Sequence, residues 1–327
     1  MPRELSLAEI FQLGYYWETK ILLTAVKLDV FSALDGKART AGEIAGRLSA
    51  DERALTLVLN ALVAIGVLKK EADRFVNTTT AQLHLVKNAP AYVGHLLLLH
   101  DAEWMNWGKL EDAVRTGRSP VTRHVFETDP ELGANVLAVL HRIGQQTGPD
   151  LARRSELAGA RTLLDLGGGA GTNAIAFCTV YPDLRATIFD LPQTLKTAER
   201  IVKDAGLEDR ITLKAGDFNR DGLGGPYDAV LMSDILHYQG PNENATLVTK
   251  CLAHLNKGGR LIIKDRFLDE AGTSPAWVTA FAVHILVNTE HGRCYRVSDA
   301  ARWMQDAGFQ GVEEVERTSV VRGTKPA

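Results

Sequence analysis

The spacing of apolar side chains changes near the middle of this chain. Up to about residue 157, apolar residues recur every three or four positions, as in "SLAEIFQLGYYWETKILLTAVKLDVFSAL", where the pattern lasts about eight helical turns. From residue 162 on, short apolar runs alternate with stretches of helical spacing. We therefore predict a mainly helical domain over residues 1–157 and an α/β domain over residues 158–327.

One part of the helical domain predicts the order helix, helix, hairpin. Thr40 begins a short helix with a capping box, an amphipathic helix covers about 51–65, and "VLKKEADRFVNT" predicts two strands around a charged turn. This winged-helix pattern often binds DNA. Because Glu71 and Asp73 lie among the cations of the hairpin, it offers no cluster of Lys and Arg for phosphates. We expect a scaffold or dimerisation module and no nucleic-acid partner.

The second domain predicts a Rossmann-like, doubly wound and mostly parallel sheet. Helical stretches at 172–181, 193–205 and 242–255 separate its β-rich runs, which are "TLLDL", "RATIFD", "RITLKAGDF", "YDAVLMSDIL" and "RLIIKDRF". The tail "GFQGVEEVERTSVVRGTKP" adds two strands, which we expect to form an antiparallel pair at one edge.

Composition narrows the functional class only a little. The 327 residues carry a formal net charge of −3, which gives no general reason to expect nucleic acid or an acidic membrane as partner. The three cysteines are far apart and predict neither a disulfide framework nor a zinc site. Since the N-terminal stretch lacks a signal-length apolar core and "YVGHLLLLHD" is too short to span a bilayer, we expect a cytoplasmic protein without a membrane partner.

Candidate chemistry begins at the turn "DLGGGAGT" after the first strand of the sheet. Ligands of doubly wound sheets bind beyond the carboxyl ends of the strands, and Gly167, Gly169 and Gly171 permit positive φ and a close approach to the backbone. The plain alternative is a tight connection between strand and helix. Thr172 occupies the last glycine position of the dinucleotide fingerprint, which counts against an NAD-dependent dehydrogenase.

Three acids follow three successive strands and favour a different nucleoside. Asp165 is placed to hold a cationic amine, Asp190 to accept both ribose hydroxyls, and Asp217 to accept from the adenine amine, with Phe218 covering the ring. The glycine turn carries no Lys or Arg to neutralise a phosphate. An adenosine bearing an amino acid fits this set better than a pyrophosphate does, so we predict S-adenosylmethionine (SAM) as the cofactor.

At this point the chain resembles SAM-dependent class I methyltransferases of the plant caffeate and acetylserotonin O-methyltransferase type. The likeness covers nearly the whole chain and depends on "DLGGGAGTNA", "FDLP", "GDF" and "HGRCYRVSDAARWMQDAGF", together with the winged-helix half. The resemblance implies a Rossmann-like C-terminal domain, a homodimer built by the N-terminal domain, S-adenosylhomocysteine (SAH) as product, and Leu191 of "FDLP" among the cofactor-binding residues.

A histidine suits the removal of a proton from a phenol, because its pKa lies near the working pH. His237 comes just past the carboxyl end of the fourth strand, at the same sheet edge as the glycine turn. It also matches the family's base in its "MKWILHDW" type of motif, the alternative being a hydrogen-bonded histidine at a helix start. In that motif Ser233 replaces the family lysine near the adenosine, so we keep Ser233 as a cofactor contact.

The resemblance also implies an acid that orients the imidazole. Asp265 matches the family's acid after the fifth strand, while the family's second acid falls on Cys294, whose thiol cannot serve as a carboxylate. Glu290 lies four residues before Cys294, and many bacterial relatives have "NTEGGR" there. We expect Asp265 or Glu290 to partner His237, and the departure at Cys294 leaves open whether the substrate is a phenol of the plant kind.

Helices over the site provide candidates for the substrate pocket, although aromatic side chains at helical spacing are often only core. The candidates are Trp104, Trp107, His141, Trp277, Phe281, His284 and Asn288. In the family the long first helix reaches the partner's pocket, so Tyr15, Tyr16 and Trp17 either line that pocket or pack in the dimer core.

We therefore predict an O-methyltransferase that acts on a hydroxyl of a flat, mostly apolar small molecule, with no metal. Two alternatives stay open: a SAM-binding relative that methylates carbon or catalyses non-methylating chemistry, and a winged-helix regulator that senses a ligand.

Overall fold

The computed structural model describes residues 4–121 and 128–327 of the chain. It divides into two compact units, Met1–Trp104 and Met105–Ala327. We predicted a boundary near residue 157, where the sheet begins. The second unit begins earlier because two helices that precede the sheet, α11 (Pro130–Gly144) and α12 (Gly148–Arg154), pack against α13 (Thr172–Val180).

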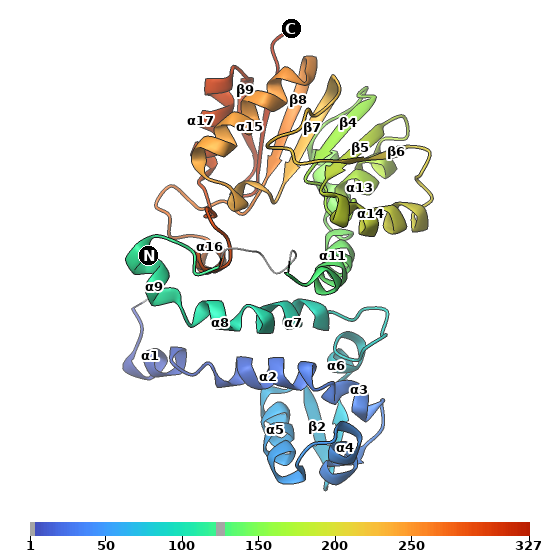
Figure 1. The fold of residues 1–327 in the computed structure, drawn as a ribbon, viewed down its shortest axis with the longest axis vertical. Coiled ribbons are helices and arrows are strands. Elements are labelled where there is room, and N and C mark those ends of the chain that lie inside the picture. Colours follow the sequence, from blue (N-terminus) through green and yellow to red (C-terminus); the bar gives the residue numbers. More distant parts are fainter. Residues whose placement is uncertain (1–3, 122–127) are drawn as a thin grey trace. The chain divides into compact units, whose positions relative to one another are not determined.

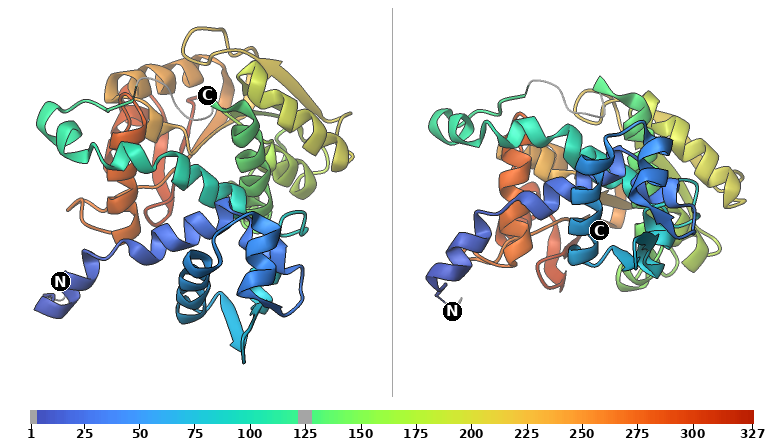
Figure 2. Two further views of the ribbon diagram at one scale, coloured as in Figure 1. Left: turned by 60° about the horizontal axis from the view of Figure 1, so that its bottom comes forward. Right: turned by 90° about the horizontal axis from the view of Figure 1, so that it is seen from below.

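The N-terminal apolar periodicity, which continues over about eight turns, does not form one helix. It is divided among α1 (Leu7–Leu13), α2 (Trp17–Lys27) and α3 (Val30–Leu34). Gly14 ends α1, and Asp29 adopts a left-handed conformation with φ 63° between α2 and α3. Spacing alone did not reveal these breaks, because the apolar period continues across them. In Figures 1 and 2, α2 lies alongside α7 (Gly94–Ala102), against which it packs.

The remainder of the first unit is the predicted winged helix. Thr40 caps its first helix and accepts the Glu43 N–H at 3.2 Å, and Gly66 ends the second helix in a left-handed conformation. The three short strands pair antiparallel in the order β1-β3-β2. The elements are β1 (Arg39–Thr40), α4 (Ala41–Leu48), α5 (Glu52–Ile65), β2 (Leu68–Glu71), β3 (Arg74–Asn77) and α6 (Thr79–His84).

The second unit contains a seven-stranded sheet in the order β6-β5-β4-β7-β8-β10-β9. The first five strands in this order are parallel, and β10 pairs antiparallel with β8 and β9, which confirms the mostly parallel sheet with an antiparallel edge. The strands are β4 (Thr162–Leu166), β5 (Arg185–Asp190), β6 (Ile211–Ala215), β7 (Tyr227–Ser233), β8 (Leu255–Lys264), β9 (Gln310–Glu316) and β10 (Val320–Thr324).

Helices cover both faces of this sheet, as Figure 1 shows, because successive side chains of a strand point to opposite faces. Leu163 packs in one buried cluster with α12, α13 and α14, whereas Leu164 and Leu166 pack in another with α15 and α17. The remaining elements are α8 (Trp104–Trp107), α9 (Leu110–Thr116), α14 (Pro192–Asp204), η1 (Leu236–Tyr238), α15 (Pro241–Ala253), α16 (Ala276–Asn288) and α17 (Val297–Ala307). Within the described ranges, no helix has the length and apolar character needed to cross a membrane.

Candidate active site

The glycine turn follows β4 and has a backbone that other residues rarely adopt. Gly167, Gly169 and Gly171 have φ angles of 67°, 55° and 78°. A Cβ atom on Gly167 would lie 2.6 Å from Ile235 Cγ2, and one on Gly171 would lie 2.7 Å from Ile188 Cδ1. Glycine is therefore required here both by conformation and by space, and the turn presents bare backbone at the carboxyl edge of the sheet.

Asp190 joins the end of β5 to this turn. Its Oδ2 accepts the Gly169 N–H at 2.8 Å and its Oδ1 accepts the Leu191 N–H at 2.7 Å. Burial raises the pKa of Asp190, although hydrogen bonds from Gly169, Leu191 and Thr194 oppose the rise. Leu191 itself is exposed. The carboxylate of Asp190 thus lies against the bare backbone of the glycine turn, and the exposed Leu191 follows it in the chain.

The position of Asp165 does not match the expectation that its carboxylate holds a cationic amine directly. Its side chain is fully buried, and its Oδ2 accepts the Ala174 N–H of α13 at 3.0 Å. Burial raises the pKa of Asp165 to about 7, and its Oδ1 is buried without a hydrogen bond. The geometry makes Asp165 a support for the first turn of α13, because a carboxylate without exposed surface offers a ligand no direct contact.

Asp217 and Phe218 follow β6, where they were expected beside the nucleoside base. Asp217 Oδ1 accepts the Asn219 N–H at 2.9 Å, and Oδ2 lies 3.4 Å from Arg220 Nε in a pair that is open to solvent. Phe218 packs against the buried cluster of β7 and β8. A Cβ on Gly167 would lie 3.5 Å from Phe218 Cε1, so the aromatic ring adjoins the glycine turn.

His141 also belongs to this part of the site. Its Nδ1 lies 2.9 Å from Thr172 Oγ1, the hydroxyl of the first residue of α13, and burial lowers the pKa of the imidazole. Leu137, one turn earlier on α11, lies nearest to the position of a Cβ on Gly169. The structure therefore places His141 over the glycine turn and not among the pocket candidates of α16.

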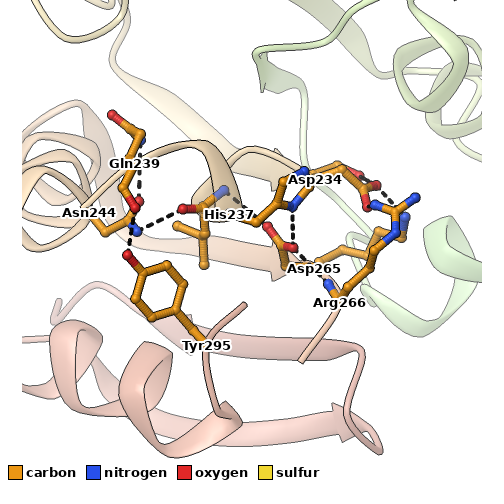
Figure 3. A network of polar contacts seen from close by, with 10 residues as sticks. Asp234, His237, Gln239, Asn244, Asp265, Arg266 and Tyr295 are labelled. Atoms are coloured by element: carbon orange, nitrogen blue, oxygen red, sulfur yellow. Dashed lines mark hydrogen bonds and ion pairs between the residues drawn. The ribbon is translucent and has the colours of Figure 1, made fainter. Parts of the chain in front are cut away.

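His237 lies on η1 and meets Asp265 directly (Figure 3). Its side chain is only 2% exposed, and Nδ1 donates to Asp265 Oδ1 at 2.7 Å. Asp265 Oδ1 also accepts the Arg266 N–H at 2.7 Å, and Oδ2 accepts the Leu236 N–H at 3.0 Å. Since Nδ1 carries the proton, Nε2 is the basic nitrogen, and within residues 4–121 and 128–327 it has no hydrogen-bond partner.

A second group of polar side chains fixes η1 from the side of α15. Asn244 donates to the Leu236 carbonyl at 3.0 Å, and Gln239 donates to Asn244 Oδ1 at 3.2 Å (Figure 3). The Tyr295 hydroxyl donates to the Gln239 carbonyl at 2.5 Å. The short turn that carries His237 is therefore held at several points, which limits the positions open to its imidazole.

Of the two candidate partners of His237, Asp265 lies at the imidazole and Glu290 does not. The side chain of Glu290 is 77% exposed, and its Oε1 lies 3.7 Å from His291 Nε2, whereas Asp265 is buried against the imidazole of His237. Cys294 is buried, and burial raises the pKa of its thiol to about 12, with the charge of Asp265 adding to the rise. Neither Glu290 nor Cys294 provides a carboxylate at the imidazole, and Asp265 does.

Helix α16 brings most of the expected pocket residues together. The Phe281 ring meets His237 edge-on with centroids 5.2 Å apart, and His284 stacks on Phe281 at 5.7 Å. Trp107 lies 6.1 Å from His284, and Trp277 lies 6.0 Å from Phe281. These rings form one aromatic wall that begins at the imidazole.

Polar side chains complete this wall, and one candidate lies elsewhere. Asn288 accepts a hydrogen bond from Asn106 at 2.7 Å, and its own amide nitrogen lies 3.1 Å from His284 Nδ1. Trp104 belongs to the first compact unit, where the Lys20 ammonium lies over its ring at 4.6 Å. Trp104 is therefore not placed against His237 by this structure.

Three charged residues of the site were missed in the sequence. Asp234, which follows β7 with φ 58°, forms ion pairs with Lys264 and Arg266 and accepts the Ser233 hydroxyl at 3.0 Å. Burial alone would raise the pKa of Asp234, but the two cations outweigh it and lower the pKa to about 2. The available signal was their place directly at the carboxyl ends of β7 and β8.

Comparison with known proteins is consistent with this arrangement. Residues 107–310 match the model of an O-methyltransferase domain, and residues 11–87 match that of an O-methyltransferase dimerisation domain. The tetracenomycin polyketide synthesis 8-O-methyl transferase TcmO of Streptomyces glaucescens is 32% identical over 94% of this chain and 91% of its own length.

Two solved structures have the same fold. An O-methyltransferase family protein from Burkholderia thailandensis is 27% identical, covers 99% of both chains and superposes with a TM-score of 0.88. Human N-acetylserotonin methyltransferase, solved in complex with SAM, is 21% identical, covers all of both chains and gives a TM-score of 0.85.

Proposed function

The chain belongs to the O-methyltransferase family, and from this membership we propose that it methylates a hydroxyl of a flat aromatic or polyketide-like molecule. The protein is a SAM-dependent methyltransferase. The observation that carries the proposal is the contact of 2.7 Å between His237 Nδ1 and Asp265 at the carboxyl edge of the sheet, which leaves Nε2 as a base beside an aromatic wall.

The residues around the glycine turn fit SAM. Its backbone leaves room where a Cβ on Gly167 would collide, and Asp190 presents a carboxylate beside that space. We assign the ribose hydroxyls to Asp190, the adenine to Leu191, Asp217 and Phe218, and a supporting role to Asp165. Ser233 is a weaker candidate, because its hydroxyl already donates to Asp234. SAM supplies an electrophilic methyl carbon on its sulfonium.

The proton of the substrate hydroxyl passes to His237 Nε2. Asp265 fixes the Nδ1–H tautomer, so that the free lone pair lies on Nε2, and its negative charge stabilises the imidazolium that forms. Burial of the pair strengthens this interaction, because little water competes for the carboxylate. The reaction then needs only the acceptor oxygen placed in line with the methyl carbon.

The aromatic wall of α16 supports a flat acceptor. Phe281 and His284 are stacked and extend from the imidazole, and the paired amides of Asn106 and Asn288 offer polar contacts at the far end of the wall. Offset stacking against such rings favours planar substrates. The name of the Streptomyces glaucescens relative, a polyketide 8-O-methyl transferase, supports the same substrate class.

We further propose a homodimer assembled through the N-terminal unit. The matched dimerisation domain covers residues 11–87. The helix α1 and the residues around it expose a row of apolar side chains, an unusual feature for a surface that faces only water: Leu5, Leu7, Ile10, Phe11, Leu13, Tyr15, Tyr16 and Trp17. Sedimentation equilibrium should give twice the chain mass of 35.7 kDa, and a monomer at micromolar concentration would contradict the dimer.

The proposed reaction is tested by replacing the base. His237→Gln should lower kcat about 10²–10⁴-fold on hydroxynaphthoate or hydroxyanthraquinone acceptors, because general-base catalysis contributes that much, while the SAM Kd stays unchanged. The matched control is His254→Gln, whose histidine lies at the opposite edge of the sheet, where its carbonyl accepts the Tyr227 N–H at 2.9 Å. Equal kcat values for the two variants would refute the base, and a C-methylated product would refute O-methylation.

A further inference from the structure

The acid that orients the imidazole lies between two cations in the sequence. Lys264, Asp265 and Arg266 are consecutive at the end of β8. Both cationic side chains turn to one carboxylate, that of Asp234, which pairs through Oδ2 with Lys264 and through Oδ1 with Arg266. Figure 3 shows the pair of Asp234 and Arg266 beside Asp265. The backbone reinforces this arrangement, because the Asp234 N–H donates to the Lys264 carbonyl at 2.8 Å.

Resting on the proposed role of His237, we propose that Asp234 is a positioning residue for methyl transfer. Its carboxylate holds and neutralises the two cations that flank Asp265, and thereby reserves Asp265 for the imidazole. Asp234 touches neither cofactor nor acceptor in this proposal and acts only through the His237–Asp265 pair.

The charges of the group explain why such a residue is needed. With His237 neutral, the negative charges of Asp234 and Asp265 balance the positive charges of Lys264 and Arg266. Without Asp234, one positive charge is left over beside a histidine that must itself become positive during the reaction. Since like charges at short range repel strongly in a half-buried site, the imidazolium would be disfavoured.

Geometry gives the freed cations a competing target. Asp265 Oδ1 already receives the imidazole N–H and the Arg266 N–H, so a further donor to this oxygen must displace one of them. A guanidinium is a strong bidentate partner for carboxylates. In the structure Arg266 is kept elsewhere, over the Phe281 ring at 4.8 Å and against Asp234. Asp234 therefore keeps Arg266 on the aromatic wall and away from the acid of the catalytic pair.

A double-mutant cycle tests the proposal. Asp234→Asn keeps a residue that tolerates φ 58° but removes the charge, and it should lower kcat at least about tenfold with unchanged SAM Kd. Arg266→Gln removes one cation together with its contact to the Phe281 ring, and it should lower kcat less than Asp234→Asn does. In the double variant the surplus charge is gone, so kcat should recover from the level of Asp234→Asn to that of Arg266→Gln.

A merely structural ion pair predicts the opposite pattern. Both single variants would then be impaired alike, and the double variant would not recover; that result, or unchanged kcat in Asp234→Asn, overturns the proposal. Asp228→Asn, at the other end of β7, is the matched control for substitution of a strand-end aspartate.

If Asp234→Asn does not fold, the kcat of Arg266→Gln tests the proposal by itself. A loss of kcat in Arg266→Gln as large as that in Asp265→Asn would then refute the proposal. Failure of His237→Gln to slow the reaction would instead refute the proposed function.

Discussion

Two pairs of carboxylates lie at the same edge of the sheet, and their surroundings are opposite. Asp165 and Asp190, which we call the cofactor-side pair, are met by neutral N–H and hydroxyl donors, and burial raises the pKa of both. Asp234 and Asp265, the base-side pair, meet Lys264, Arg266 and the imidazole of His237. Among the residues that the structure describes, the cofactor-side pair has no cationic partner, whereas the base-side pair is paired with Lys264, Arg266 and His237.

This difference separates the two tasks of the site. A buried carboxylate without a cation is costly to ionise, so the cofactor-side pair is stabilised when a ligand brings positive charge. SAM does so through its sulfonium. The negative charges of the base-side pair are already balanced by Lys264 and Arg266, so a further cation would stabilise this pair little. These charges can instead stabilise the proton that His237 takes up. We infer that cofactor binding and proton removal depend on separate carboxylates.

The largest effect should come from the base-side acid. Asp265→Asn replaces the acceptor of the Nδ1–H by a neutral amide, which neither fixes the tautomer nor stabilises the imidazolium. We expect kcat to fall by about 10²-fold or more, while calorimetry finds the SAM Kd unchanged. A variant that lost SAM affinity and kept its kcat would break the division between the two pairs.

The reverse pattern is expected of the cofactor side. Asp190→Asn removes a charged acceptor for the ribose hydroxyls, and we expect the SAM Kd to rise about tenfold to a hundredfold. At saturating SAM, kcat should stay within about threefold of wild type, since the base is untouched. Steady-state kinetics over a wide SAM range separates the two quantities, and an unchanged Kd would show that Asp190 does not contact the cofactor.

The smallest effect concerns stability. Because the pKa of Asp165 rises from 3.8 to about 7 on folding, the folded chain keeps a proton that the unfolded chain has lost between those values. Stability therefore falls as pH rises through this window. Asp165→Asn lacks this titration and still offers an oxygen to the Ala174 N–H. Its Tm relative to wild type should rise by roughly 2–6 °C between pH 5 and pH 8, and a constant difference would contradict the raised pKa.

Short apolar runs and strand ends predicted much of this site. The runs "TLLDL" and "RLIIKDRF", separated by stretches of helical spacing, predicted the buried strands. Because residues that end parallel strands share one edge, Asp190 and His237 were expected at the same edge, and the resemblance to the family added Asp265. The glycine turn was predictable for a similar reason, because only glycine combines positive φ with so little space.

What the sequence did not reveal depends on directions of side chains and on loops. Helical spacing does not reveal Asp29, whose left-handed backbone separates α2 from α3 without changing the apolar period. The choice between Asp265 and Glu290 depended on a loop after α16, which no period describes. Asp234 was missed because its importance comes from two cations on the neighbouring strand, and such a pairing becomes visible only with the register of β7 and β8.

The most direct test of the division is the number of protons released when SAM binds. If the positive charge of SAM acts on the cofactor-side pair, through space in the case of the buried Asp165, the raised pKa values of the pair must fall and protons must leave the protein. Calorimetric titration of SAM at pH 7, in buffers of different ionisation enthalpy, measures that release, and comparison with Asp165→Asn removes the contribution of SAM's own amine. We predict that wild type releases more protons than Asp165→Asn. Equal release by the two proteins would contradict the account.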